Sequence, residues 1–262
     1  AGVKIELIVR GICCLKVGIP GVSHVLAEPV AALALPFVGG HPFGHAVHYL
    51  AWENLKGVAI SLTIGIVSML CSLVVGGLLG ALAAVNSGVT DNIIMRICDI
   101  FMSIPGTLLA ISICAALGNG MTNLIIAITV SMVPSFARTV RASMLTVKDQ
   151  EYIEAAKAIG ASKARLVLRH MIPNALGPII VSATLNVAAS ITAAAALSFI
   201  GLGVQAPTPE WGCMLNSAKQ YFTHADKWYV VAFPGLMIVI TVFALNLFGD
   251  GLRDALDPRS KN

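Results

Sequence analysis

Long apolar stretches separated by short polar segments make up most of the chain. About 20 predominantly apolar residues are enough for a helix to cross a bilayer. Five stretches fit this length: 58–85, 97–117, 121–137, 175–200 and 229–249. A sixth, 17–39, is long enough but is interrupted by His24 and Glu28, so an interfacial helix is its alternative. Because no insertion of domain size separates these stretches, we predict a single all-α polytopic membrane domain over 1–262 with about six spans.

Charged residues are few and unevenly placed. Of the 262 residues 57% are hydrophobic and 11% charged, and the mean hydropathy is +0.85, whereas a soluble domain carries about 25% charged residues. Seven of the 17 Lys and Arg residues lie between Arg138 and Arg169. Such a cluster is also typical of nucleic-acid binding, but the cytoplasmic bias of Lys and Arg in membrane proteins explains it better. We predict no nucleic-acid partner, and a cytoplasmic loop at 138–173 with both termini on the same side.

Within this loop, "EYIEAAKAIGASKARLVLRHMIPN" (151–174) has the pattern of two short amphipathic helices. Their apolar stripes follow helical spacing: Tyr152, Ala155, Ala156 and Ile159, then Ala164, Val167, Leu168 and Met171. Gly160 is placed to end the first helix, Ser162 to cap the second, and Pro173 to end it where the chain re-enters the membrane. Glu154 and Lys157 lie off the first stripe at a spacing that permits an ion pair.

A docking element for a cytosolic partner is the interpretation we favour for this loop. The alternative is a solvated loop that carries basic residues to the lipid surface, but it gives no role to the glycine elbow. It also leaves unexplained the small residues of the loop, which would let another backbone approach closely: Ala155, Ala156, Gly160 and Ala161.

The same stretch resembles the EAA loop of bacterial ABC-importer permeases. Glu154-Ala155-Ala156, Gly160 and Pro173 match that pattern at its spacing. Further segments are similar to the C-type subunit of the dipeptide, oligopeptide and nickel permeases, so the resemblance extends over residues 57–259. These segments are "MRICDIFMSIPG" (95–106), "ARTVRASMLTVKDQEYIEAAKAIGAS" (137–162), "SFIGLGVQAPTPEWGCML" (198–215) and "FALNLFGDGLRDALDPR" (243–259).

The resemblance implies a type I ABC-importer permease fold in a bacterial inner membrane. It also implies four partners: a homologous second permease subunit, two cytosolic ATP-binding subunits and an extracytoplasmic substrate-binding protein. The EAA helix of such importers inserts into a groove of the ATPase, and the residues that would make this contact are Glu154, Ala155, Ala156, Gly160, Ala161, Lys163, Arg165 and Arg169. No GxxxxGK[ST] phosphate loop occurs in the chain, so we expect no cofactor on it, no enzyme activity, and ATP and Mg on the partner subunits.

Peptides are the first substrate class that the resemblance implies, and nickel is the second. The segment "HPFGHAVHYLAWENLKGVAISL" (41–62) begins as in the family but lacks the acidic and Arg positions that follow there. We therefore treat residues 1–57 as an atypical N-terminal segment that holds the sixth span. His41, His45 and His48 are spaced for one helical face, and a nickel relay is conceivable. Since no carboxylate or cysteine is spaced to complete such a site, we predict no metal site and incidental histidines on an interfacial helix.

Polar residues inside the predicted spans have two interpretations each. Arg96 and Asp99 lie one turn apart, and a structural ion pair is favoured because isolated charges are costly near lipid. Thr184, Asn186, Ser190 and Thr192 are candidates to line a translocation path, although small polar residues also join membrane helices. The segment 201–212 is too rich in Gly and Pro for a helix and should fold back at the outer face, with Trp211 as an interfacial anchor.

Other function classes fit the sequence less well. A secondary transporter or channel acting alone is the first alternative, but the spans carry no ring or chain of buried carboxylates, and the two halves lack matching interrupted helices. A structural membrane-assembly protein would not need the glycine elbow. An enzyme is least expected, because no nucleophile–base pair or metal constellation can be assembled from the loops.

Overall fold

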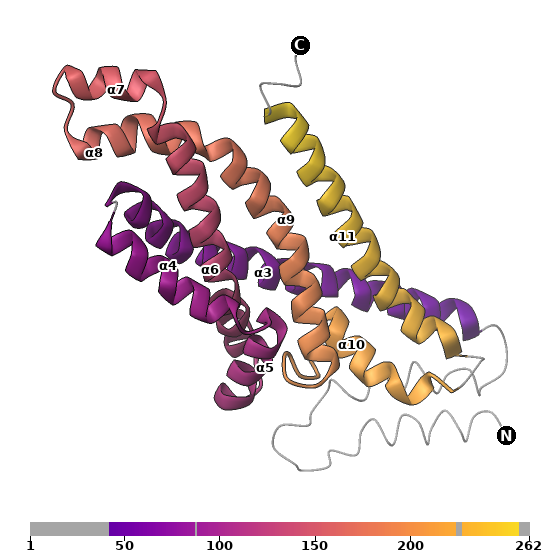
Figure 1. Ribbon diagram of the computed structural model, residues 1–262. Coiled ribbons are helices and arrows are strands. Elements are labelled where there is room, and N and C mark those ends of the chain that lie inside the picture. Colours follow the sequence, from indigo (N-terminus) through magenta and orange to yellow (C-terminus); the bar gives the residue numbers. More distant parts are fainter. Residues whose placement is uncertain (1–41, 87, 224–226, 257–262) are drawn as a thin grey trace, which may run out of the picture.

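The computed structural model describes residues 42–86, 88–223 and 227–256 (Figure 1). All regular elements of this part are helical: α3 (Pro42–Val85), α4 (Val89–Met102), α5 (Gly106–Leu117), α6 (Met121–Lys148), α7 (Glu151–Ala158), α8 (Lys163–Arg165), η2 (Leu166–Met171), α9 (Ile172–Phe199), α10 (Trp211–Ala218), η3 (Lys219–Tyr221) and α11 (Trp228–Leu256). The predicted all-α class is therefore confirmed for the described residues. The predicted span 17–39 lies outside them.

Four helical stretches are long and apolar enough to cross a membrane. They are Glu53–Val85, Met121–Lys148, Lys163–Phe199 and Trp228–Leu256. They contain the predicted spans 58–85 and 121–137, nearly all of 175–200, and 229–249. Helices α4 and α5 pass the same test only as a pair, which makes up to five spans among the described residues.

The predicted span 97–117 falls on the bent pair α4 and α5, and the bend was not predicted. The chain bends by 82° between α4 and α5. Pro105 has no N–H to donate and disfavours helical backbone at Ile104 before it, while the Ser103 hydroxyl donates to the carbonyl of Ile100 at 2.7 Å and so satisfies the end of α4. A hydropathy window detects the apolar length of this segment but not its change of direction.

Helix α6 extends further than its apolar run. The predicted span 121–137 lies within α6, and the helix continues to Lys148, through the first third of the predicted loop 138–173. Two arginines of this extension face α4 and are neutralised there: Arg138 contacts Asp99 and Arg141 contacts Asp91, each at 2.6 Å. The Lys148 ammonium donates to the carbonyl of Ala84 at 2.9 Å. The ends of α3 and α6 and the start of α4 thus lie together.

Helix α3 runs obliquely behind α6, α9 and α11 (Figure 1) and packs most extensively against α6. Two glycines permit this close packing. A Cβ at position 76 would lie 2.6 Å from the carbonyl oxygen of Val133, and one at position 80 would collide with that of Ala137. Small residues at a crossing allow membrane helices to approach closely. The α3–α6 pair is therefore the packing centre on which the other helices rest.

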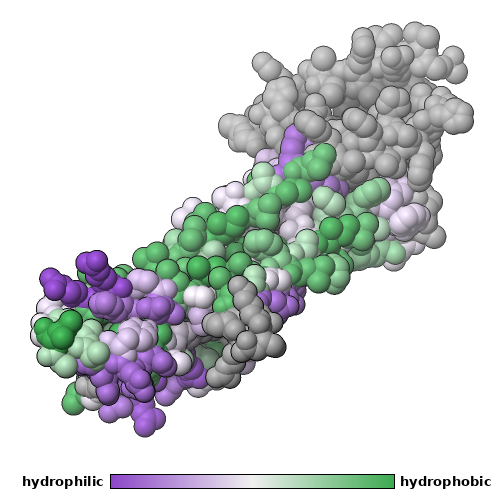
Figure 2. Space-filling view, turned by 90° about the horizontal axis from the view of Figure 1, so that it is seen from above, coloured by the Kyte–Doolittle hydropathy of each residue, from purple (hydrophilic) through white to green (hydrophobic). Residues whose placement is uncertain are grey.

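The two ends of the molecule are formed by different helices. Helices α7 and α8 lie at one end, on the same side as the C-terminal end of α11, and α10 lies at the other (Figure 1). In Figure 2 hydrophilic residues gather at the end that α7 and α8 occupy, and hydrophobic residues cover the middle of the molecule. This distribution is the one expected of a chain that crosses a membrane.

Candidate coupling site

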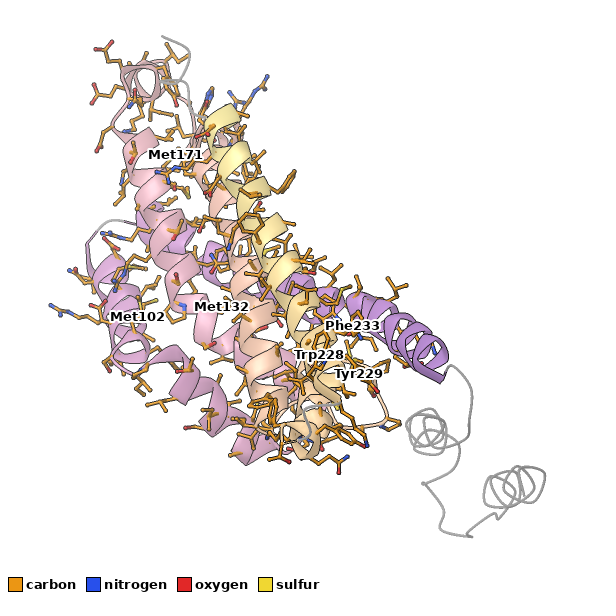
Figure 3. The ribbon with its side chains drawn as sticks, turned by 90° about the vertical axis from the view of Figure 1, so that its right-hand side faces the viewer. Met102, Met132, Met171, Trp228, Tyr229 and Phe233 are labelled. Carbon is orange, nitrogen blue, oxygen red and sulfur yellow. The ribbon has the colours of Figure 1, made fainter. Side chains whose placement is uncertain are left out.

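Helix α7 packs on its own chain through one face only. Ile153 is 0% exposed and Ala156 is 9% exposed, and both join an apolar cluster with Val147, Leu166 and Met171. Figure 3 shows Met171 where the α7–α8 segment meets the spanning helices. Burying these side chains fixes α7 across the ends of α6 and η2.

The rest of the surface of α7 points away from the described part of the chain. Tyr152 is 44% and Ile159 87% exposed, and Ala155 is exposed as well. Of the predicted stripe Tyr152, Ala155, Ala156 and Ile159, only Ala156 is buried. Both faces of this short helix have helical periodicity, so the pattern alone did not say which of them packs internally.

Gly160 ends α7 as predicted. Its φ of +84° lies in the left-handed region, which side chains with a Cβ disfavour. The N–H of Gly160 donates to the carbonyl of Lys157 at 3.0 Å, and that of Ala161 to the carbonyl of Ala156 at 3.1 Å. This bond pair is a Schellman motif. A Cβ at position 160 would meet no atom within 4 Å, so the backbone conformation, and not packing within the chain, requires glycine here.

The second helix of the loop begins as predicted but does not end as predicted. The Ser162 hydroxyl accepts from the N–H of Arg165 at 3.4 Å and caps α8. The helix then continues through a π-helical turn, η2, into α9. The prediction that Pro173 ends the helix was wrong, because the helix continues through Pro173, which lies just after the π-helical turn η2.

The second predicted stripe is half correct. Met171 is buried and Val167 half-buried, whereas Ala164 and Leu168 are exposed, Leu168 at 69%. Leu166, which the prediction left off the stripe, is buried in its place. Like α7, this segment therefore packs on its own chain through part of its apolar surface and presents the rest outward.

The charges of the loop are solvent-exposed on both sides of the elbow. Glu151 and Glu154 lie in the first turn of α7, where the helix dipole favours carboxylates, and Lys157 lies in the last. The predicted Glu154–Lys157 pair does not form, and the other exposed cations of the loop, Lys163, Arg165 and Arg169, also have no ion-pair partner in the described part of the chain. The loop thus presents apolar, acidic and basic groups that the described part of the chain leaves unpaired.

The predicted Arg96–Asp99 ion pair was also wrong. Asp99 pairs with Arg138 of α6 at 2.6 Å, and Arg96 forms no ion pair among the described residues. Arg141 donates through two nitrogens to both carboxylate oxygens of Asp91, at 2.6 Å each. The i, i+3 spacing suggested a pair between Arg96 and Asp99. The continuation of α6 past residue 137 instead places Arg138 beside Asp99.

The predicted irregular segment 201–212 is irregular only up to Glu210, because α10 begins at Trp211, and Trp211 is not an interfacial anchor. Its ring is 0% exposed and its Nε1–H donates to the carbonyl of Asn54 at 3.2 Å. Beside it the buried Glu210 carboxylate accepts from the N–H groups of Gly212 at 3.0 Å and Cys213 at 2.8 Å and caps α10. Burial raises the pKa of Glu210 and outweighs these bonds and that of Ser198, which lower it. The prediction missed this carboxyl, whose signal was an acidic residue directly before a helix start.

The four candidate path residues all bond to the carbonyl four residues earlier on their own helix. Thr184, Ser190 and Thr192 use their hydroxyls and Asn186 its amide, at 2.8 to 3.0 Å. Ser190 is fully buried and lies 3.1 Å from the Met132 sulfur of α6 (Figure 3 labels Met132). Helix joining is therefore the role that the contacts of Ser190 support, and the path role of the other three stays a prediction.

The histidine prediction is mostly beyond the described structure. His41 lies outside the described residues, while the backbone at His45 and His48 belongs to α3. Among the described residues no group of three or more His, Cys, Asp or Glu side chains is arranged to hold a metal ion.

Comparison with known proteins gives matches over most of the chain. The family model for the binding-protein-dependent transport system inner membrane component matches residues 76–262. A second model, polyphosphate kinase C-terminal domain 2, matches residues 1–28, which lie outside the described part.

Two curated relatives are nearly half identical to the chain. The glutathione transport system permease protein GsiD of Pectobacterium atrosepticum is 46% identical over 208 residues, which are 79% of this chain and 68% of the relative. The di/tripeptide transport system permease protein DppC of Pseudomonas aeruginosa is 47% identical over 208 residues, with the same coverage.

Solved structures share the fold at lower identity. The inward-facing MetNI methionine ABC transporter has a TM-score of 0.65 at 24% identity, covering 79% of this chain and 97% of that one. An amino acid ABC transporter with histidines has a TM-score of 0.60 at 17% identity, covering 81% and 96%. The chain belongs to the binding-protein-dependent transport system inner membrane component family, and it is an all-helical permease of the ABC-importer type from a bacterial inner membrane.

Proposed function

We propose that this chain forms half of the translocation path of an ATP-driven importer of short peptides and that α7 couples this path to a cytosolic ATPase. The outward face of α7 is the observation that carries the coupling role. It holds an almost fully exposed isoleucine, Ile159, next to the exposed Tyr152 and Ala155. Exposed apolar groups rimmed by charges mark protein interaction sites.

The shape of the loop suits insertion into a groove. Ala155 adds little bulk beside Ile159, and the Schellman turn at Gly160 ends the helix abruptly. Glu154 precedes this patch, while Lys163, Arg165 and Arg169 follow it, all exposed. Ala156 and Ala161 are more buried, so their role is to seat α7 on its own chain.

The remaining partners follow from membership of the family. We infer a homologous second permease subunit, two cytosolic ATP-binding subunits that carry ATP and Mg, and an extracytoplasmic binding protein that delivers the substrate. The chain itself has no phosphate-binding loop, so its part is to transmit the energy of hydrolysis and not to release it.

Peptides of two or three residues are the substrate class that we propose. The relatives named above are permeases for glutathione and for di- and tripeptides, and all three substrates are short peptides. No observation on the described residues favours nickel.

A bulky side chain introduced on the outward face of α7 tests the coupling role. We expect Ala155→Trp to abolish co-purification of the ATPase subunits and uptake of a labelled tripeptide, with the chain still present in the membrane. Ala255→Trp is the matched control, because Ala255 is an exposed helical alanine at the C-terminal end of α11, on the same side of the molecule. Equal ATPase recovery for the two variants would refute the coupling role of α7.

A further inference from the structure

Two kinds of exposed apolar face remain on the membrane part of the described structure. The first kind is an unbroken helix with large apolar side chains, as on α3, which exposes Leu70, Val74, Val75, Leu78 and Leu82, and on α11. The face of α11 consists of large apolar side chains on an unbroken helix: Leu236, Val239, Ile240, Phe243 and Leu247. The second kind belongs to α4 and α5 and combines apolar side chains with a backbone break and an exposed cation.

The break itself is exposed. Every residue from Phe101 to Leu108 is exposed in the isolated chain, and the 82° bend lies in the middle of this segment. Helix α4 has 14 residues, about 21 Å at 1.5 Å per residue, which is shorter than the hydrocarbon core of about 30 Å, so the chain bends before α4 alone could cross it. Irregular backbone within the hydrocarbon core is tolerated where protein or a water-filled cavity covers it, but not against lipid.

Arg96 lies in the apolar face of α4. Positions 89, 93, 96 and 100 share one side of the helix by their spacing, and Val89, Ile93 and Ile100 are exposed there together with Arg96. The nearest carboxylate along the helix, Asp99, is held by Arg138. A guanidinium facing lipid is costly unless it is paired, and its planar fork is suited to a carboxylate.

We propose that this face, comprising the exposed side of α4 and the bend to α5, is the contact surface for the second permease subunit, and that Arg96 pairs there with a carboxylate of that subunit. The inference rests on the proposed function, which supplies the partner. A polytopic partner satisfies all three features, because it covers the bend, buries the apolar side chains and supplies the missing anion. A soluble ATPase fits less well, since α4 and α5 together are long and apolar enough to cross a membrane.

Site-specific photo-crosslinking tests the surface. p-Benzoyl-L-phenylalanine replaces Ile100 on this face or Phe243 on α11, in the complete complex in native membranes, and adducts are identified by mass spectrometry. We expect an adduct with the second permease subunit from position 100 and at least about tenfold less of it from position 243. No protein adduct from position 100, an adduct with a second copy of this chain, or equal yields from both positions would overturn the proposal.

Charge reversal tests the ion pair. Removing one partner of a buried pair leaves the other charge uncompensated, so we expect Arg96→Glu and Arg96→Gln to lower recovery of the second subunit at least about tenfold, and Arg96→Lys to retain most of it. Arg253→Glu, at an exposed cation near the end of α11, is the control. Wild-type recovery with both Arg96→Glu and Arg96→Gln would refute the ion pair.

The two proposals fail separately. If the unmodified chain retains neither the ATPase nor a second permease subunit, the proposed function is wrong. If it retains both, but position 100 does not reach the second subunit, only the assignment of this surface is wrong.

Discussion

The carboxyl group of Glu210 is fully buried at the end of the molecule opposite α7. Its hydrogen bonds come from two backbone N–H groups of α10 and from the Ser198 hydroxyl, which in turn accepts from the N–H of Val204 at 3.1 Å. A Cβ at Gly212 would collide with the carbonyl of Ala195. One carboxyl therefore fastens the segment 201–210 to the ends of α9 and α10.

This burial predicts a pH dependence of stability. Because burial raises the pKa of Glu210 above its ordinary value, the folded protein holds the proton more tightly than the unfolded chain. The contribution of Glu210 to the free energy of unfolding is therefore largest below the ordinary pKa and is lost as the pH rises through the raised one.

The measurement is the thermal unfolding midpoint of the purified permease in detergent, from about pH 5 to about pH 8. We expect the midpoint of the wild type to fall relative to that of Glu210→Gln as the pH rises across this range. Parallel curves for the two proteins would show that Glu210 does not titrate there.

Gly160 gives a second test at the scale of one residue. Its positive φ costs a residue with a Cβ about 1–2 kcal/mol, whereas asparagine tolerates that conformation better. We therefore expect ATPase recovery and tripeptide uptake to decrease in the order Gly160, Gly160→Asn, Gly160→Ala, Gly160→Val. If close approach of the ATPase were the reason for glycine, Gly160→Asn would be worse than Gly160→Ala, because its side chain is larger.

At the scale of the elements, the α3–α6 contact depends on the absence of two side chains. A Cβ at Gly80 would collide with the carbonyl of Ala137, whereas one at Gly77 has its nearest neighbour, a Val140 methyl, at 4.0 Å. Overpacking costs about 1–3 kcal/mol, and here the obstacle is backbone that cannot rotate away. We expect Gly80→Ala to lower the thermal midpoint clearly.

Gly77→Ala, on the same helix and with the same added methyl group, should leave the midpoint nearly unchanged. The comparison separates the close contact from the helix propensity of alanine, which favours both variants equally. A Gly80→Ala variant as stable as Gly77→Ala would contradict the packing described for α3 and α6.

The elements also show where sequence patterns suffice. Apolar length predicted the spans at 58–85 and 229–249, because a helix in a membrane must keep its backbone hydrogen bonds internal. It also found the apolar segment 97–117, but not the bend there, which follows from Pro105 and leaves the composition unchanged. The cap at Gly160 was predictable because its bonds are local. The face on which α7 packs, and the Arg138–Asp99 pair, depend on contacts between elements distant in sequence.

At the scale of the whole molecule, one continuous helix connects the two ends. From Lys163 to Phe199 the helix continues without a break, through the π-helical turn, from the α7–α8 segment to the segment 201–210. Met171 joins the start of this path to the cluster that holds α7, and Ser198 joins its end to Glu210. We therefore expect that a displacement of α7 by the ATPase also displaces the segment 201–210, because one continuous helix links the two.

This arrangement requires the two ends to lie on opposite sides of the membrane. The basic end with α7 should be cytoplasmic, and the segment 201–210 should face outward, where the binding protein would dock. The exposed Ala158 of α7 and the exposed Gln205 provide one position at each end. In a chain whose natural cysteines are replaced, Gln205→Cys should react with a membrane-impermeant maleimide added to intact spheroplasts, and Ala158→Cys should react only after lysis. Labelling of Ala158→Cys before lysis would show that α7 lies on the outer side of the membrane, where the ATPase could not reach it.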